Sequence, residues 1–541
     1  MNFKLNRGFN LLRLAKSEKK NIACAFSCDL KCEKNLNFHL VALDNNNCTS
    51  EITKSTPHVW YNEVSDTCNL SINFNSLQNT EIYLACHSPS AISVDITNIN
   101  LNESSQTLSE NLFNFMHFSQ QTEFPTWKEL VLDEINLDNG NGFDYPLIEN
   151  TYDKQEILRM MEVLTTNRLT MGQNVDLFEK EFAKYVGAKY AIMVNSGSSA
   201  NLLSMAVATN YKRKNKLNAG DKVIVPNICW STSVWPIIQM NLQPVFVDID
   251  PTTMNMNIDE LEKLITPEVK GIVAVHILGN CTDMDRLMKI VNDNNLFMME
   301  DTCESLGSLY KNKMLGTFGD FGTYSFYYSH HITTVEGGMV VCNDDDDYEL
   351  LKCLRAQGWT RYLKDKKELE EQYKEVDPRF LFVNVGYNLR PMETQAAMGR
   401  VQLAKLNEKN ASRIYNHDML VDKILRDTRN TNIFSSPVAM ENSHPAWFAL
   451  TFVFSENYEH HYRSFMDHLT ANKVENRPVV TGNFARQPIF KFMGIEVEPS
   501  CYEGAEVLHK RGFFIGLSCS DMSEERMNIL VDIFYSYNFN Q

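Results

Sequence analysis

This sequence lacks three features, and each absence narrows the possible functions. It has no run of about 18 apolar residues, the length that a membrane-spanning helix requires, so we expect no membrane span. It is short of basic residues, with 51 Lys and Arg against 68 Asp and Glu, and its net charge is -17. A nucleic-acid surface needs clustered Lys and Arg, so we expect no nucleic acid among the partners. Residues 1–20 hold basic side chains but no sustained apolar segment, which predicts no secretory signal and a cytoplasmic location.

A metal-binding set of cysteines is also missing. The chain has 13 cysteines, and Cys24, Cys28 and Cys32 lie four residues apart. No His or Cys partners complete a metal site around them, so we expect no metal. The odd total, without a secretory signal, indicates reduced thiols.

The 541 residues exceed what one ordinary core needs, and the pattern changes along the chain. Residues 1–125 contain short alternating runs such as Leu70–Phe74, which predict a small all-β accessory domain of unknown function. A polar linker is expected over 126–150. A large α/β domain follows over 151–405, and a smaller α+β domain over 406–541.

The region from residue 151 alternates helical segments with apolar runs, which is typical of a mainly parallel sheet covered by helices. We expect strands at five runs: 190–194, 222–225, 244–248, 271–275 and 296–299. Ligands bind such sheets at the carboxyl ends of the strands.

Three of these runs are followed by residues suited to a cofactor. Small residues over 195–201 can bring backbone N–H groups close to an anion at a helix N-terminus. Trp230 follows another strand and could stack on a flat ring, and Asp301 ends a third. Taken singly, the first two features are more often a helix cap and a core aromatic, whereas two carboxylates at the carboxyl end of a strand, Glu300 and Asp301, are rarely there for packing alone. Their common position at strand ends favours one site.

Together with Thr323–Gly338 and Gly386–Ala397, these segments resemble the DegT/DnrJ/EryC1/StrS family of sugar aminotransferases over roughly residues 150–540. The resemblance implies a fold-type-I transferase fold, the cofactor pyridoxal 5'-phosphate, with its amine form pyridoxamine 5'-phosphate, and a homodimer. It also implies the following roles: Gly197, Ser198 and Ser325 hold the phosphate, Trp230 stacks on the ring, Asp301 pairs with the pyridine nitrogen, Glu304 lies near the ring hydroxyl, and Asn388 reaches the phosphate of the neighbouring subunit.

The lysine that carries the cofactor in most of the family is absent, and His330 stands at its position. Histidine cannot bind the cofactor covalently, but it can move a proton near neutral pH. Within the family, this histidine marks the sugar 3-dehydratases. The kind that carries an iron–sulfur cluster needs further cysteines soon after the histidine, yet none lies between Cys353 and Cys501. The segments Asp377–Gln395, Arg477–Phe484 and Arg511–Gly516 resemble the other kind, the GDP-4-keto-6-deoxymannose 3-dehydratases.

The implied function is C3 dehydration of a nucleotide-linked 4-keto-6-deoxyhexose to a 4-keto-3,6-dideoxyhexose, with L-glutamate as amino donor. GDP is favoured over CDP as the nucleotide, and such sugars serve lipopolysaccharide O-antigen synthesis. Two alternatives stay open at this point. One is a nucleotide-sugar 4-aminotransferase that works without the usual lysine, and the other is a non-catalytic scaffold whose β domain binds glycans. Val335 departs from the family pattern, which has Gly there.

Overall fold

The computed structural model describes residues 142–430 and 432–540 in full, and the backbone of nine strands within residues 2–107. The chain divides into two compact units, Met1–Asn136 and Leu137–Gln541. The strands of the first unit pair antiparallel, in the orders β1-β8-β3-β6-β5 and β2-β7-β4, with β9 on β8. They are β1 Asn2–Leu5, β2 Gly8–Ser17, β3 Ile22–Cys32, β4 Phe38–Asp44, β5 His58–Trp60, β6 Thr67–Ser76, β7 Thr80–Ser88, β8 Ile92–Glu103 and β9 Gln106–Thr107. The predicted domain bounds and the role of this region stay predictions, and the side chains of Cys24, Cys28 and Cys32 lie outside the described residues.

The second unit is built on a seven-stranded sheet with the order β10-β20-β19-β16-β15-β11-β12. Its strands are β10 Tyr190–Val194, β11 Lys222–Pro226, β12 Gln243–Val247, β15 Val269–Val275, β16 Phe297–Asp301, β19 Phe321–Ser325 and β20 Gly338–Cys342. The five strands β19, β16, β15, β11 and β12 are parallel to one another. Strand β20 runs antiparallel to both of its neighbours, β10 and β19. The sheet is therefore mixed and mostly parallel, and each of the five predicted strand runs overlaps one of its strands.

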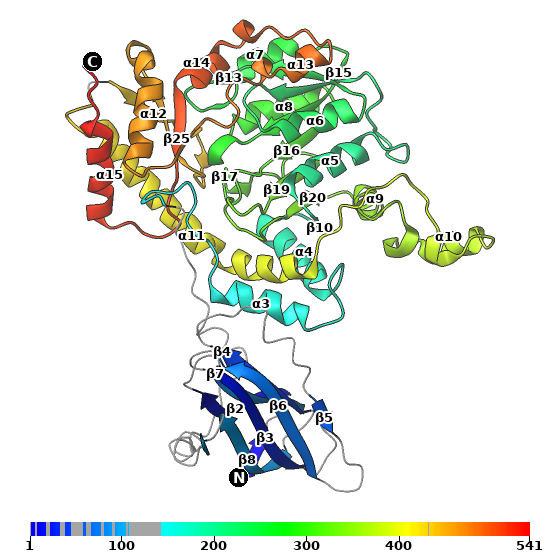
Figure 1. Ribbon diagram of the computed structural model, residues 1–541. Helices are drawn as coiled ribbons and strands as arrows, with labels where there is room; N and C mark the ends of the chain where they lie inside the picture. The colour runs from blue at the N-terminus through cyan, green and yellow to red at the C-terminus, as the bar shows by residue number, and fades with distance from the viewer. Residues whose placement is uncertain are drawn as a thin grey trace. The chain divides into compact units, whose positions relative to one another are not determined.

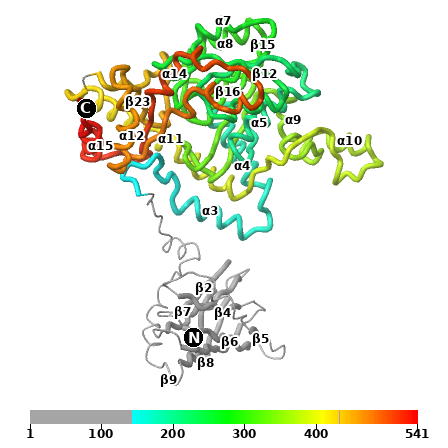
Figure 2. The backbone as a smooth tube through the Cα atoms, turned by 45° about the horizontal axis from the view of Figure 1, so that its top comes forward, coloured from blue at the N-terminus to red at the C-terminus, as the bar shows by residue number. Residues whose placement is uncertain are grey.

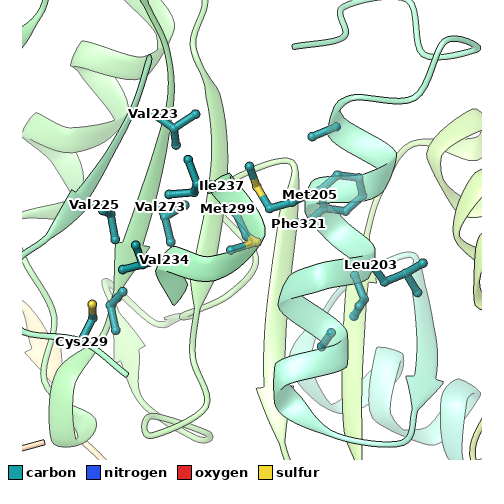
Figure 3. Packing of buried hydrophobic residues seen from close by; sticks show 14 of the residues in the cluster. Leu203, Met205, Val223, Val225, Cys229, Val234, Ile237, Val273, Met299 and Phe321 are labelled. Atoms are coloured by element: carbon teal, nitrogen blue, oxygen red, sulfur yellow. The ribbon is translucent and has the colours of Figure 1, made fainter. Parts of the chain in front are cut away.

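Helices cover both faces of this sheet (Figure 1). Successive side chains of a strand point to opposite faces, and both sets are buried against helices. Val223 and Val225 pack with the helices α5 and α6, whereas Ile224 packs with α7 and α8. Figure 3 shows the first of these two layers. The helices of this part of the chain are α3 Lys154–Leu164, α4 Gln173–Val186, α5 Gly197–Ala208, α6 Ser231–Gln239, α7 Ile258–Leu264, α8 Met284–Asp293, α9 Asp345–Arg355 and α10 Lys366–Gln372, of which α10 projects away from the sheet (Figure 1).

A smaller four-stranded sheet, β21-β23-β25-β24, forms a second core near the C-terminus, built largely of phenylalanines such as Phe434, Phe452 and Phe513. The 34-residue helix α11, Glu393–Arg426, contacts α3 and α4 at one end and α15 at the other, so it joins the two cores (Figures 1 and 2). The remaining elements of this part are β21 Phe434–Ser435, β23 Leu450–Phe454, β24 Asn476–Pro478, β25 Gly512–Ile515, α12 Tyr462–Ala471, α13 Ile489–Phe492, α14 Glu503–Arg511 and α15 Glu524–Ser536.

Short strands and single turns complete the second unit. Two small sheets hold β13 Ile249–Asp250 with β14 Asn255–Met256, and β17 Leu309–Tyr310 with β18 Lys313–Met314 and β22 Ser443–His444. The 3-10 turns are η3 Ile277–Gly279, η4 Thr360–Tyr362, η5 Pro378–Phe380, η6 Glu456–His461, η7 Phe484–Arg486 and η8 Pro499–Cys501. In the described parts of the chain, no helix is long and apolar enough to cross a membrane.

Candidate active site

A cavity of about 490 Å³ lies where several strands of the large sheet reach their carboxyl ends. All but one of the predicted site residues line it, namely Gly197, Ser198, Trp230, Asp301, Glu304, Ser325 and His330. A more open groove of about 770 Å³, lined by Arg213 and Lys270, contains none of them. We therefore take the smaller cavity as the candidate active site.

The N-terminus of α5 forms one end of the cavity. Ser196 caps this helix, and its side chain accepts a hydrogen bond from the N–H of Ser199 at 3.0 Å. A Cβ atom added to Gly197 would lie 2.6 Å from Cβ of Ser325. Only glycine therefore lets β19 approach the helix end so closely. The result is a small pocket of N–H and hydroxyl groups, the kind of surroundings that suit a phosphate.

Asp301, the last residue of β16, is buried and firmly held. Its Oδ2 atom accepts hydrogen bonds from Nδ2 of Asn201 and from Oγ of Ser233, each at 2.7 Å. Its Oδ1 atom accepts one from the N–H of Cys303 at 3.2 Å. The carboxylate is thus fixed beside the cavity, where it can pair with a cationic ring nitrogen.

His330 is half-buried, with its ring edge-on to the rings of Phe448 and Tyr327 at centroid distances of 5.3 and 6.0 Å. Burial lowers the pKa of His330 to about 4, and the nearby charges of Asp301 and Arg413 act in opposite directions on it. The imidazole is consequently neutral near pH 7, the state in which it can accept a proton.

Glu304 is the second titrating group of the cavity. Its Oε2 atom accepts a hydrogen bond from the N–H of Leu278 at 3.0 Å. Burial raises the pKa of Glu304 to about 7; the hydrogen bond from Leu278 acts in the opposite direction, and the charge of Asp301 adds to the rise. Near neutral pH both the protonated and the ionised form of this carboxyl group are therefore populated.

Asn388 is the one predicted site residue that does not line the cavity. It is exposed, and its Oδ1 atom accepts a hydrogen bond from Nε of Arg390 at 3.0 Å. Its expected role toward a neighbouring subunit, like the roles of the other site residues, stays a prediction.

Sequence reasoning did not pick out the two residues that hold Asp301. Asn201 lies one helical turn after Gly197, and Ser233 lies three residues after Trp230, so each shares a helix face with a predicted residue. This i,i+3 and i,i+4 spacing was a usable signal. Phe448, by contrast, comes from a distant segment and had no such signal.

The residues present fit pyridoxal phosphate. The tight approach of Gly197 to Ser325 leaves N–H and hydroxyl groups for the phosphate. Trp230 is 57% exposed although it is a large aromatic, so its ring is available for stacking at the cavity. Asp301 would hold the ring nitrogen. Among the described residues that line the cavity, none is a lysine.

Comparison with known proteins agrees with this geometry. Residues 150–534 match the DegT/DnrJ/EryC1/StrS aminotransferase family. The GDP-4-keto-6-deoxy-D-mannose 3-dehydratase of Yersinia pseudotuberculosis is 38% identical over 394 residues, which cover 71% of this chain and 97% of that protein. The enzyme of the same name from Escherichia coli O55:H7 is also 38% identical, over 69% of this chain and 95% of its own length. A crystal structure of GDP-4-keto-6-deoxymannose-3-dehydratase with a trapped PLP-glutamate geminal diamine superposes with a TM-score of 0.67 and 36% identity, over 72% of this chain and all of that one.

Proposed function

Because this chain belongs to the DegT/DnrJ/EryC1/StrS aminotransferase family, we propose that it removes the C3 hydroxyl of a nucleotide-linked 4-keto-6-deoxyhexose, using pyridoxal phosphate and L-glutamate. The product is a 4-keto-3,6-dideoxyhexose. The similarity to two GDP-4-keto-6-deoxy-D-mannose 3-dehydratases at 38% identity supports GDP as the nucleotide.

The proposal rests mainly on the residue at the position where most of the family has the cofactor-binding lysine. In this chain that residue is His330. His330 lines the cavity with Asp301 and Trp230, and no lysine is among the described lining residues. An aminotransferase needs a lysine to carry the cofactor and to return a proton to the carbon that receives nitrogen. A cavity that keeps the cofactor groups but offers only an imidazole favours elimination over amine transfer.

We assign the following roles to the residues of this chain. The α5 N-terminus and Ser325 would bind the phosphate, Trp230 would stack on the ring, and Asp301 would keep the ring nitrogen protonated. When bound, pyridoxal phosphate supplies an electron sink for the electron pair that stays behind when a proton leaves carbon. His330, neutral at working pH, would accept that proton and give it to the departing C3 hydroxyl.

The overall reaction is balanced by glutamate. The sugar loses one oxygen atom, and glutamate leaves as 2-oxoglutarate and ammonia. Glutamate therefore supplies the two electrons that replace the C–O bond by a C–H bond, and no other reductant is needed.

Purified protein incubated with cofactor, glutamate and GDP-4-keto-6-deoxymannose tests the proposal by mass spectrometry. We expect a sugar nucleotide lighter by one oxygen atom, with 2-oxoglutarate and ammonia in equal amounts. Nitrogen retained on the sugar would instead identify a 4-aminotransferase. Absence of 2-oxoglutarate in cofactor-loaded protein would identify a non-catalytic scaffold. A parallel incubation with the CDP-linked sugar decides the nucleotide.

A further inference from the structure

A buried arginine lies behind the active-site histidine. Arg413, on α11, is only 4% exposed, and its Nη1 atom donates to the carbonyls of Phe448 and Leu517 at 3.1 and 3.3 Å. In the described part of the chain, no carboxylate forms an ion pair with it, and its Nε atom has no hydrogen-bond partner. The charge of Glu149 acts on Arg413 without an ion pair. A buried cation whose hydrogen bonds go to carbonyl groups costs stability, so its presence calls for an explanation.

Phe448 connects this arginine to the cavity. Its backbone is held on both sides, because its N–H donates to the carbonyl of Leu278 at 3.0 Å and its own carbonyl accepts from Arg413. Its ring packs against His330 at 5.3 Å with the two planes at 74°, and against His331 at 5.7 Å and 60°. The position of the Phe448 backbone therefore sets the wall against which both imidazoles rest.

His331 is tied to the same segment. Its Nε2 atom lies 2.8 Å from the carbonyl oxygen of Ala446, an acceptor, so Nε2 carries the proton. The N–H of Ala446 in turn donates to Oγ of Ser308 at 2.9 Å. Residues 446–448 are thus held by hydrogen bonds to Ser308, Leu278 and Arg413, and both histidines contact this segment.

We propose that Arg413 is a positioning residue for His330, acting through the backbone carbonyl and the ring of Phe448. The inference rests on the proposed function, in which His330 moves the proton. A proton-transfer group must be held close to one geometry, and a small displacement of such a group is costly in rate. Arg413 supplies that support without touching the cavity.

The charge of Arg413 adds a second effect. Burial is the main cause that lowers the pKa of His330, and the charge of Arg413 lowers it as well, while Asp301 raises it. The other charged and titratable groups around this imidazole, from the elements that line the cavity or lie beside it, are His276, Cys303, Glu304, Tyr327, His331, Glu336 and Arg477. Removal of the arginine should therefore move the His330 titration upward.

The test uses a readout that does not depend on turnover. Exchange of the imidazole C2 hydrogen for deuterium, followed peptide by peptide with mass spectrometry, reports the titration of each histidine in the full-length protein. In native protein without added sugar, we expect His330 to titrate far below an ordinary histidine. In Arg413→Met, it should titrate closer to the ordinary range and exchange faster.

Kinetics provide the second readout. We expect Arg413→Met to lower kcat by about 10- to 100-fold, with KM within about twofold of native because no sugar contact is lost. The matched control is Arg400→Met, on the same helix, where the arginine pairs with the partly exposed Glu181. This control should leave both readouts unchanged.

Phe448 variants keep the test decisive if Arg413→Met does not fold. Phe448→Leu keeps Arg413 and the backbone carbonyl but removes the ring that packs against His330. Because burial is the main cause of the low pKa of His330, this variant should also move the His330 titration upward and lower kcat. Phe448→Tyr keeps the ring and should behave like native protein. Native-like His330 titration and kcat in both Arg413→Met and Phe448→Leu would overturn the proposal. If native protein gives no dehydration product, the proposed function fails, yet the histidine titration still decides the positioning role.

Discussion

Glu304 should contribute a decrease in the stability of the ligand-free protein as pH rises, and Glu304→Gln should remove that contribution from the pH dependence. The pKa of this carboxyl group is raised from 4.5 to about 7, chiefly by burial. Between these two values, the unfolded chain is ionised at Glu304 while the folded protein still holds the proton. At this group the folded state then binds more protons, so the contribution of Glu304 to the free energy of unfolding decreases with increasing pH, opposite to that of the buried His330 and His331, whose pKa values are lowered.

The size of the effect follows from the pKa difference. A rise in the pKa from 4.5 to about 7 corresponds to about 3 kcal/mol in the free energy of unfolding. This contribution to stability is fully present below pH 4.5 and is lost by about pH 8. Glutamine has the same shape and no charge, and it can still accept the hydrogen bond from the N–H of Leu278. We therefore expect the variant to be more stable than native protein at pH 8 and similar to it at pH 4.5 to 5.

Urea unfolding followed by tryptophan fluorescence measures this at fixed protein concentration across pH 4.5 to 8. Glu336→Gln is the matched control, because Glu336 lines the same cavity but is exposed. It should leave the pH dependence of native protein in place. Equal slopes for native protein and Glu304→Gln would refute the reasoning and show that Glu304 is ionised in the folded state.

Four further outcomes are expected. Gly197→Ala should weaken cofactor binding and cost about 1–3 kcal/mol of stability, because the new Cβ would lie 2.6 Å from Ser325; cofactor titration and thermal unfolding measure the two effects. His330→Lys should be labelled covalently by the cofactor after borohydride reduction and should lose dehydration, whereas native protein should stay unlabelled; covalent labelling of native protein through another lysine would contradict the role given to His330. A protein that begins near Phe124 should keep the release of 2-oxoglutarate from glutamate, and its loss in a folded truncation would show that residues 1–125 are required. Activity should fall on dilution together with dissociation of a dimer, because Asn388 is expected to complete the partner's site; a monomer with full activity would contradict this.

The sequence predicted the position of the candidate site well because the site follows from strand ends. Apolar runs indicated the strands, and parallel strands bring their carboxyl ends to one edge of the sheet. Gly197, Trp230 and Asp301 each follow or end such a strand, and they meet at one cavity with Ser325. Ser325 ends β19, which is not among the five predicted runs, and it was named only through the family resemblance. Local pattern was sufficient to place Gly197, Trp230 and Asp301 because their position depends on the strand that precedes or contains them, whereas their roles were implied by the resemblance.

The supporting residues could not be predicted in the same way. Arg413 lies on α11 and Phe448 in the segment before β23. Arg413 contacts Phe448, and Phe448 contacts His330, only because the chain folds distant segments together. An arginine within a long helix is ordinarily a solvated residue. Nothing in the pattern around it distinguishes Arg413 from Arg400, although one is buried and the other is paired near the surface.

Val335 has a backbone conformation that valine disfavours, and hydrogen bonds from neighbouring residues hold its turn in that conformation. Its φ angle is 68°, in the left-handed region that a β-branched residue rarely adopts and that glycine takes freely. Three hydrogen bonds hold the turn: the N–H of Val335 donates to Oγ1 of Thr333 at 2.9 Å, and the carbonyl of Glu336 accepts from Thr334 at 2.8 Å and from Gln395 at 2.6 Å. Because these partners determine the shape of the turn, Glu336 still reaches the cavity despite the departure from glycine at position 335.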